Sequence, residues 1–95
     1  LTLRNVVFHK NRSDDQGGAL YNDFNAATRC EQVIFTQNHA RNQGGAVAQL
    51  SGRASSYLNT IFYKNTVSIG AGAALFHQSA SEADQPVLTN TIVYG

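Results

Sequence analysis

The chain has 95 residues, a net charge of +1 and only 14% charged residues. This length allows at most one domain, and so small a charge excludes the basic field that marks nucleic-acid and anionic-membrane binding. The apolar runs are too short to span a bilayer, and the single cysteine, Cys30, excludes an internal disulfide framework and a multi-cysteine metal site. Because the chain begins without Met and ends inside a strand-like run, we expect a fragment of a longer protein.

A strand-like element at residues 6–11, VVFHKN, returns twice further along the chain. Its second copy is VIFTQN at residues 33–38, and its third copy is TIFYKN at residues 60–65. Successive copies are 27 residues apart, so that phenylalanine and asparagine recur together as an F-x-x-N motif. The residues of this motif are Phe8 and Asn11, Phe35 and Asn38, and Phe62 and Asn65.

Each repeat continues into a glycine-rich element. GGAL at residues 17–20 returns as GGAV at residues 44–47, whereas the third copy, GAGAAL at 70–75, matches only if one residue is inserted before Leu75. The fourth copy begins 31 residues after the third, so the third repeat carries four extra residues. We place most of these in a longer loop at residues 79–86, a polar stretch that ends in the only proline.

Self-similarity at a fixed period predicts a solenoid. No window of ten or more residues keeps a 3.6-residue apolar period, which argues against helical repeats. A leucine-rich repeat is the main alternative, because residues 3–11 fit its L-x-x-L-x-L-x-x-N frame. That family needs another leucine two residues past the asparagine, where this chain has Ser13, Ala40 and Val67, and it needs a helical or leucine-bearing return segment. We therefore favour a β-helix.

The predicted fold class is all-β: a right-handed parallel β-helix, a pectin-lyase-like solenoid of about three and a half coils. We interpret residues 1–95 as a single segment, with coils at residues 1–27, 28–54 and 55–85 and a partial coil at 86–95. Coils stack about 4.8 Å apart, so equivalent residues form columns. Two apolar columns are expected inside: Phe8, Phe35, Phe62 and Val93, and Leu3, Cys30, Tyr57 and Leu88.

Asparagine and glycine are expected at the corners. Asn11, Asn38 and Asn65 should share one corner, because asparagine tolerates the left-handed conformation and stacked amides can bond from coil to coil. The glycine pairs at residues 17–18 and 44–45 should supply positive φ or a close backbone approach at another corner. A second all-amide column consists of Asn5, Gln32, Asn59 and Asn90.

The pairing of F-x-x-N with G-G-A-[LV] resembles the repeats of polymorphic outer-membrane proteins. It is equally similar to the bacterial extracellular right-handed β-helix repeat proteins, and the likeness covers nearly the whole chain. The resemblance implies secretion, display at the cell surface and an adhesive, autotransporter-like or glycan-facing role. It supplies no catalytic residue. The third repeat departs from the pattern at residues 72–74, which puts the geometry of that one corner in doubt.

The adjacent acids Asp14 and Asp15 are the strongest candidates for chemistry, because two carboxylates can act as general acid and base on a glycan. Polygalacturonases, which also use a β-helix, carry such a pair. Their companion motifs N-T-D, G-H-G and R-I-K are missing here. The equivalent positions hold residues 41–42 (Arg-Asn) and 68–69 (Ser-Ile), so we predict a solvated, variable loop.

The other candidates are interpreted as structural. His9, His39 and His77 lack metal-ligand spacing, and no Asp follows the Gly-Gly-Ala motifs at the offset of calcium-binding β-rolls. Cys30 lies in an apolar column and is interpreted as a core residue rather than a nucleophile. Asn11 fits a glycosylation sequon but belongs to the turn column.

Two charged columns are expected to face outward. Arg4 and Glu31 should be neighbours on adjacent coils, in a weak surface pair. Lys10, Gln37 and Lys64 share another column, which we interpret as a solubilising face in preference to a site that helps to bind an acidic glycan.

We therefore predict no enzyme activity, no catalytic, cofactor-binding or metal-binding residue, and no cofactor. The predicted function is that of a structural or adhesive segment of a secreted or surface-displayed, outer-membrane-associated bacterial protein. Its expected partners are polysaccharide, a host or neighbouring cell surface, and adjacent coils of the parent chain, with no nucleic acid. The alternative is part of a polysaccharide lyase or glycoside hydrolase on the same fold, whose catalytic coil lies outside these residues.

Overall fold

The computed structural model of the chain describes residues 1–22, 27–50, 55–78 and 86–94. Within these ranges all regular structure is β-strand. The strands are only two to four residues long, because each turn of the chain must pass several corners. They form four parallel sheets, which we number I to IV in the order in which the chain enters them.

Sheets I and II each contain four strands. Sheet I consists of β1 (Thr2–Arg4), β5 (Arg29–Glu31), β9 (Ser56–Leu58) and β13 (Val87–Thr89). Sheet II consists of β2 (Val7–His9), β6 (Ile34–Thr36), β10 (Ile61–Tyr63) and β14 (Ile92–Tyr94).

Sheets III and IV each contain three strands. Sheet III consists of β3 (Arg12–Ser13), β7 (His39–Ala40) and β11 (Thr66–Val67). Sheet IV consists of β4 (Leu20–Asn22), β8 (Val47–Leu50) and β12 (Leu75–Gln78).

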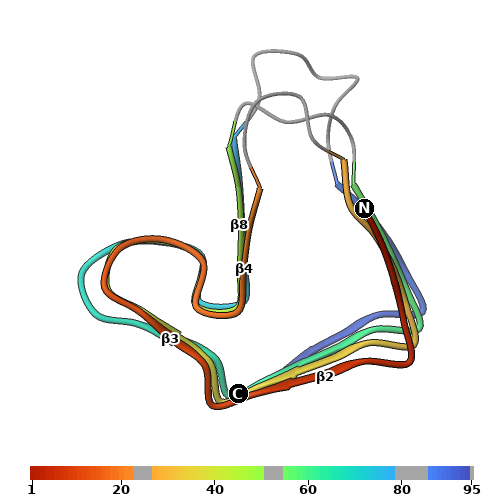
Figure 1. Cartoon of the computed structure of the whole chain (residues 1–95), viewed down its shortest axis with the longest axis horizontal. Helices are drawn as coiled ribbons and strands as arrows, with labels where there is room; N and C mark the ends of the chain where they lie inside the picture. The colour runs from red at the N-terminus through yellow and green to blue at the C-terminus, as the bar shows by residue number, and fades with distance from the viewer. Residues whose placement is uncertain (23–26, 51–54, 79–85, 95) are drawn as a thin grey trace.

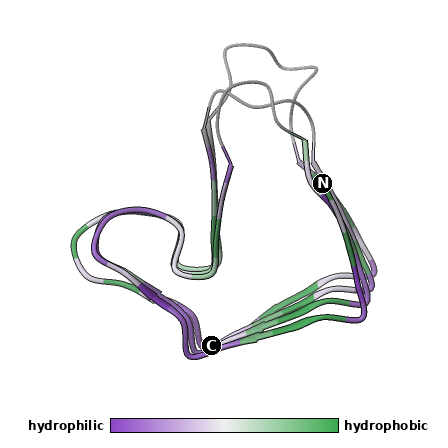
Figure 2. Ribbon diagram, viewed as in Figure 1, coloured by the Kyte–Doolittle hydropathy of each residue, from purple (hydrophilic) through white to green (hydrophobic). Residues whose placement is uncertain are grey.

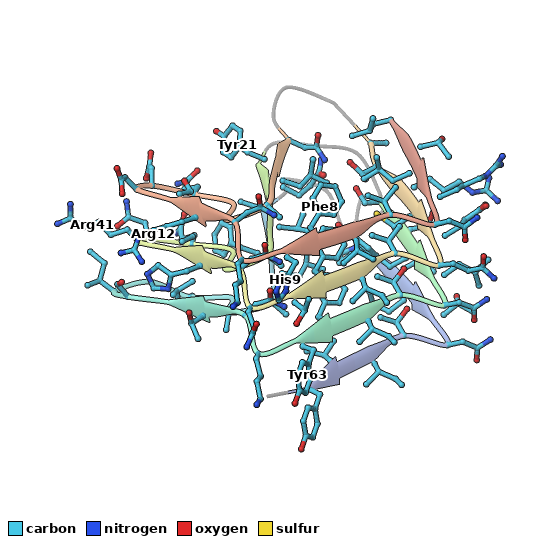
Figure 3. All side chains as sticks on the ribbon, turned by 60° about the horizontal axis from the view of Figure 1, so that its bottom comes forward. Phe8, His9, Arg12, Tyr21, Arg41 and Tyr63 are labelled. Carbon is cyan, nitrogen blue, oxygen red and sulfur yellow. The ribbon has the colours of Figure 1, made fainter. Side chains whose placement is uncertain are left out.

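The chain winds through the four sheets in order and then begins the next turn. Figure 1 looks along the axis, so the successive turns lie over one another, and Figure 3 shows them stacked with the first turn uppermost. Every strand pairs in parallel with the equivalent strand of the adjacent turn, and the winding is right-handed, as crossovers between parallel strands almost always are. The predicted right-handed parallel β-helix is confirmed.

The core contains the two predicted columns and a third apolar column from sheet IV that was not predicted, Leu20, Val47 and Leu75. The rings of Phe8, Phe35 and Phe62 stack with centroids 5.0 Å apart at each step and planes within 7° of parallel. In sheet I, Leu3 pairs in register with Cys30, and Cys30 with Tyr57. Val93 and Leu88 continue the two predicted columns in register but are exposed in the last described turn, with exposed fractions of 59% and 48%. Figure 2 shows the apolar stretches of sheets I, II and IV, and a hydrophilic sheet III.

The asparagine corner differs from its prediction in one respect. Asn11, Asn38 and Asn65 do stack at one corner, but they are not the left-handed residues. Positive φ occurs at the residues just before them, Lys10, Gln37 and Lys64, with φ of 57°, 56° and 55°. The all-amide column also takes positive φ, so that both ends of sheet II turn through a left-handed residue: Asn5, Gln32, Asn59 and Asn90.

Asparagine recurs at 11, 38 and 65 because its side chain binds the neighbouring turn. The Oδ1 atom of Asn38 accepts the backbone N–H of Asn11 at 2.9 Å and its Nδ2–H at 3.1 Å. The Oδ1 atom of Asn65 receives the same two bonds from Asn38, at 2.9 and 3.0 Å. The Nδ2 group of Asn38 also donates to the carbonyl oxygen of Phe8 at 3.1 Å. This ladder satisfies polar groups that the solenoid buries.

The glycine corner is confirmed in both of its expected roles. Gly17 and Gly44 have φ of 69° and 67°. A Cβ atom on Gly45 would lie 2.1 Å from the carbonyl oxygen of Ala73 in the next turn, so the second glycine is required by the close backbone approach. In the third turn Gly72 takes the positive φ of 73°. This confirms the one-residue insertion.

The register also locates the extra residues of the third repeat. Thr66 pairs with His39, 27 residues away, whereas Leu75 pairs with Val47, 28 residues away, so one residue is added between them. In Figure 1 this turn bulges beyond the first at the lower left. The strand pairing shifts by three more residues between β12 and β13. The loop predicted at residues 79–86 lies outside the described residues, except for Pro86.

Candidate functional site

The two acids singled out in the sequence lie between sheets III and IV. We call this part of each turn the lobe, which comprises residues 14–16, 41–43 and 68–71. Asp14 and Asp15 are both exposed. The Oδ1 atom of Asp15 accepts a hydrogen bond from Nδ2 of Asn42 at 2.6 Å, and its backbone N–H donates to Oγ of Ser13 at 3.2 Å. The prediction of a solvated loop is confirmed.

Among the described residues, the next two turns hold no acid at the positions equivalent to this pair. The backbone N–H of Asn42 bonds the carbonyl oxygen of Asp15, and the N–H of Ile69 bonds that of Arg41, as the alignment of repeats predicted. An acid–base pair for glycan cleavage needs both carboxylates directed at one bond. Here one carboxylate is held by an amide of the adjacent turn, so the arrangement is that of a loop stabilised between turns.

Cys30 is a core residue, as predicted. Its side chain is fully buried, and burial raises the pKa of the thiol to about 11. A thiol with so high a pKa stays protonated at neutral pH and is a poor nucleophile. The neighbouring Tyr57 is 1% exposed, and its pKa is also raised by burial.

The three histidines lie apart in the fold. His9 is exposed on the outer face of sheet II, in one column with Thr36, Tyr63 and Tyr94, as predicted. His39 lies in β7, and the side chain of His77, in β12, is outside the described part of the structure. Among the described residues, no three His, Cys, Asp or Glu side chains form a cluster that could hold a metal ion.

His39 makes contacts that the sequence did not indicate. Its Nδ1 atom is 2.7 Å from Oγ1 of Thr66, and its Nε2 atom is 2.8 Å from Oγ of Ser68. One ring nitrogen of a neutral imidazole donates and the other accepts, and a hydroxyl can do either. Both hydroxyls belong to the next turn, so the imidazole is fixed on the outer face of sheet III.

The predicted ion pair of Arg4 and Glu31 is present. Arg4 Nε is 2.8 Å from Oε2 of Glu31, and Arg29 Nε is 2.8 Å from the other carboxylate oxygen. The hydrogen bond from Arg4 is the main cause that lowers the pKa of Glu31. Arg4 and Glu31 also line a groove of about 220 Å³ at the corner between sheets I and II, with Asn5, Gln32, Leu58 and Asn59. Within this groove the charge of Arg4 is paired with that of Glu31.

The remaining Lys and Arg side chains in the described part of the chain lie on the other side of sheet II, around the asparagine ladder. We call Lys10, Arg12, Arg41 and Lys64 the cationic edge. All four are exposed, and within the described ranges none of them lies within ion-pair distance of a carboxylate. Figure 3 shows Arg12 and Arg41 together at one side of the molecule, pointing away from the core.

The outer face of sheet II adjoins the cationic edge. One of its columns is aliphatic: Val7, Ile34, Ile61 and Ile92. In the next column the rings of Tyr63 and Tyr94 stack at 5.3 Å with planes 3° apart, and Nζ of Lys64 lies 5.1 Å from the centroid of the Tyr63 ring. The repeat alignment predicted the column that contains Tyr63 and Tyr94, but not the stacking of their rings. The aliphatic column was not predicted, although the sequence carries a signal for it, a β-branched residue just before each phenylalanine.

The first two repeats match a known family. The sequence model of the Chlamydia polymorphic membrane protein repeat matches residues 5–23 and 32–48, which carry the first two copies of F-x-x-N and G-G-A-[LV]. Neither a curated protein nor a solved structure matches the chain. None of the described residues forms a helix long and apolar enough to cross a membrane. The match supports the resemblance to a repeat of bacterial membrane proteins.

Proposed function

We propose that the chain is a structural and adhesive segment of a surface-displayed bacterial protein, which holds rows of outward side chains against other cells or polysaccharide. The family match supports a bacterial membrane-protein repeat. The observation that carries the proposal is the in-register stacking of all four sheets, because it converts a repeated sequence into straight columns of exposed side chains.

Rigidity supports this role. Backbone hydrogen bonds join successive turns at the strands and at the corners, for example from Gln32 to the carbonyl oxygen of Leu58 at 3.0 Å. The phenylalanine column and the asparagine ladder hold the interior in the same register. A surface made of such turns can be lengthened by adding turns that stack in the same register.

The alternative is a lyase or hydrolase of acidic glycans whose catalytic turn lies outside these residues. Asp14 lies in a variable lobe and Asp15 is bonded to Asn42, so these two residues give no sign of catalysis within the chain. We favour the structural and adhesive function because the family match supports a bacterial membrane-protein repeat.

Surface display is tested in intact cells of the bacterium that produces the protein. Antibodies against residues 1–95 should label intact cells as strongly as permeabilised ones, and external protease should remove the signal. A strain that lacks the protein should be retained less well on polysaccharide-coated surfaces or cell layers, and re-expression should restore retention. Labelling that requires permeabilisation would exclude surface display, and unchanged retention would exclude the adhesive role.

A further inference from the structure

We propose that the cationic edge binds an acidic polysaccharide, a glycan with carboxylate or sulfate groups, which lies along the axis of the solenoid. The inference rests on the proposed function and names the chemical class of its ligand. It concerns Lys10, Arg12, Arg41 and Lys64 and the neutral polar groups between them.

Two columns of side chains flank the asparagine ladder in every turn. On one side lie Lys10, Gln37 and Lys64, which occupy the residue before each asparagine. On the other side lie Arg12, His39 and Thr66, which pair in register in sheet III. Adjacent turns are about 4.8 Å apart, so each column runs parallel to the axis. The hydrogen-bonded ladder between them fixes the two columns relative to each other.

Among the described Lys and Arg residues, those without a carboxylate partner are concentrated at this edge. The other two, Arg4 and Arg29, share the single carboxylate of Glu31, so two positive charges against one negative leave their cluster a net charge of +1. The carboxylates nearest the edge along the chain are those of Asp14 and Asp15 in the first turn, and Asn42 already donates to Asp15. Four cations against two acids leave an excess of positive charge at the edge, on a chain whose net charge is only +1.

Neutral hydrogen-bonding groups fill the rows between the cations. Gln37 is exposed between Lys10 and Lys64, and the hydroxyls of Thr66 and Ser68 lie against the imidazole of His39. A polysaccharide presents many hydroxyl groups and fewer charges, and these rows can donate to it and accept from it. Exposed amides and hydroxyls beside isolated cations therefore match an acidic glycan.

The same features argue against nucleic acid. Duplex DNA carries a negative charge about every 1.7 Å along its axis, and domains that bind it have a pI above about 9. This chain has a pI near 8.1, and its cations belong to turns about 4.8 Å apart. The rings of Tyr63 and Tyr94 stack on each other, so one face of each ring is already covered and less aromatic surface is left for bases.

The test measures binding of the purified protein to two acidic probes, polygalacturonate for carboxylate and heparin for sulfate. Neutral dextran and single-stranded DNA serve as comparison ligands. Two variants each remove two charges from the edge, Lys10→Gln/Lys64→Gln and Arg12→Gln/Arg41→Gln. The matched groove control, Arg4→Gln/Arg29→Gln, removes the same number of charges from the ion-paired cluster around Glu31 at and beside the groove. Circular dichroism establishes that each variant remains folded.

We expect the protein to bind at least one acidic probe and not dextran, with an affinity that falls as salt rises. Each edge variant should weaken binding roughly threefold to tenfold, and the groove control should change it less than about twofold. Absence of binding to both acidic probes, equal losses in the edge and groove variants, or tighter binding of DNA would overturn the proposal. Cells that display the protein and adhere through it, without binding either probe, would refute this inference alone.

Discussion

Two regions of each turn differ in how strictly their residue types repeat along the chain. The phenylalanine column and the asparagine corner recur without change at residues 8, 35 and 62 and at residues 11, 38 and 65. The lobe between sheets III and IV, at residues 14–16, 41–43 and 68–71, changes from turn to turn. In the first region side chains contact side chains of both adjacent turns, so a change in one turn affects its neighbours. In the lobe the turns are joined mainly by backbone hydrogen bonds. The residue type can therefore change from turn to turn, and a residue can be inserted.

Side-chain bonds within the lobe join the first and second turns at two places. Nε2 of Gln16 donates to Oε1 of Gln43 at 2.8 Å, and the residue type repeats there. Nδ2 of Asn42 donates to Oδ1 of Asp15 at 2.6 Å, and there the residue types differ. In the third turn Ala71 takes the equivalent place, since the N–H of Gly44 bonds its carbonyl oxygen. The amide pair ends in the turn that also gains a residue.

Truncation of the middle phenylalanine should have the largest effect. Phe35 is fully buried between two parallel rings, and Phe35→Ala should lower the free energy of unfolding by about 3–5 kcal/mol. The matched lobe variant, Ile69→Ala, removes a side chain that is 71% exposed and should cost less than about 0.5 kcal/mol. Denaturant unfolding of both variants measures the difference. Similar losses in the two would show that the lobe is packed as tightly as the core.

Loss of the middle asparagine should cost slightly less. Asn38→Ala leaves the N–H of Asn11 and the carbonyl oxygen of Phe8 without their partners, and we expect about 3 kcal/mol of destabilisation. Asn42→Ala removes a partly exposed amide that bonds the exposed carboxylate of Asp15 and should lower the free energy of unfolding by about 0.5 kcal/mol or less. Hydrogen exchange at the amide of Asn11 should accelerate only in the first variant. Unchanged protection there would mean that water replaces the amide without penalty.

The stacking of equivalent residues could be predicted from the sequence, because a fixed repeat period determines which residues of adjacent turns lie side by side. The 27-residue spacing alone determined which residues meet, including the pairs Leu3–Cys30 and Arg4–Glu31. The sequence did not predict the backbone conformation at the asparagine corner. Asparagine suggested a left-handed residue at Asn11, but the positive φ occurs at Lys10. The side chain of Asn11 instead bonds the next turn. The sequence also missed the contacts of His39, because periodicity assigns columns but not side-chain rotamers.

The buried thiol should make stability depend on alkaline pH. The pKa of Cys30 rises from 9.0 to about 11 on folding, so the folded state binds this proton more tightly than the unfolded state. The resulting stabilisation is complete below pH 9 and is lost as pH rises toward 11, by at most about 3 kcal/mol. Tyr57 contributes in the same direction at higher pH, so the Cys30 contribution is the difference in slope between wild type and Cys30→Ala. Identical slopes would contradict this assignment.

Removal of a single hydroxyl from the core should stabilise the protein. The Oη atom of Tyr57 is buried and has no hydrogen-bond partner among the described residues, while the ring packs edge-on against Phe62 at 5.6 Å. Tyr57→Phe keeps the ring and removes the unsatisfied group, so the free energy of unfolding should rise by about 1 kcal/mol. Tyr63→Phe, on the partly exposed outer face, should change it by less than about 0.5 kcal/mol. Destabilisation by Tyr57→Phe would indicate a bound water at that hydroxyl.

The smallest effect on stability is expected for substitution of the adjacent acids Asp14 and Asp15. Both carboxylates of Asp14 and Asp15 are exposed, so the double variant Asp14→Asn/Asp15→Asn should change the free energy of unfolding by less than about 0.5 kcal/mol. Because two negative charges disappear from the turn that carries Lys10 and Arg12, binding of polygalacturonate should strengthen by up to about threefold.

An acid–base pair would behave in the opposite way: the fold would persist, and any turnover of polygalacturonate by the protein would fall by about a hundredfold or more. Reducing-end or unsaturated-product assays on wild type and variant separate the two outcomes. Turnover that disappears in the variant would overturn the non-enzymatic function, whereas tighter binding without turnover would assign the lobe to the charge balance of the cationic edge.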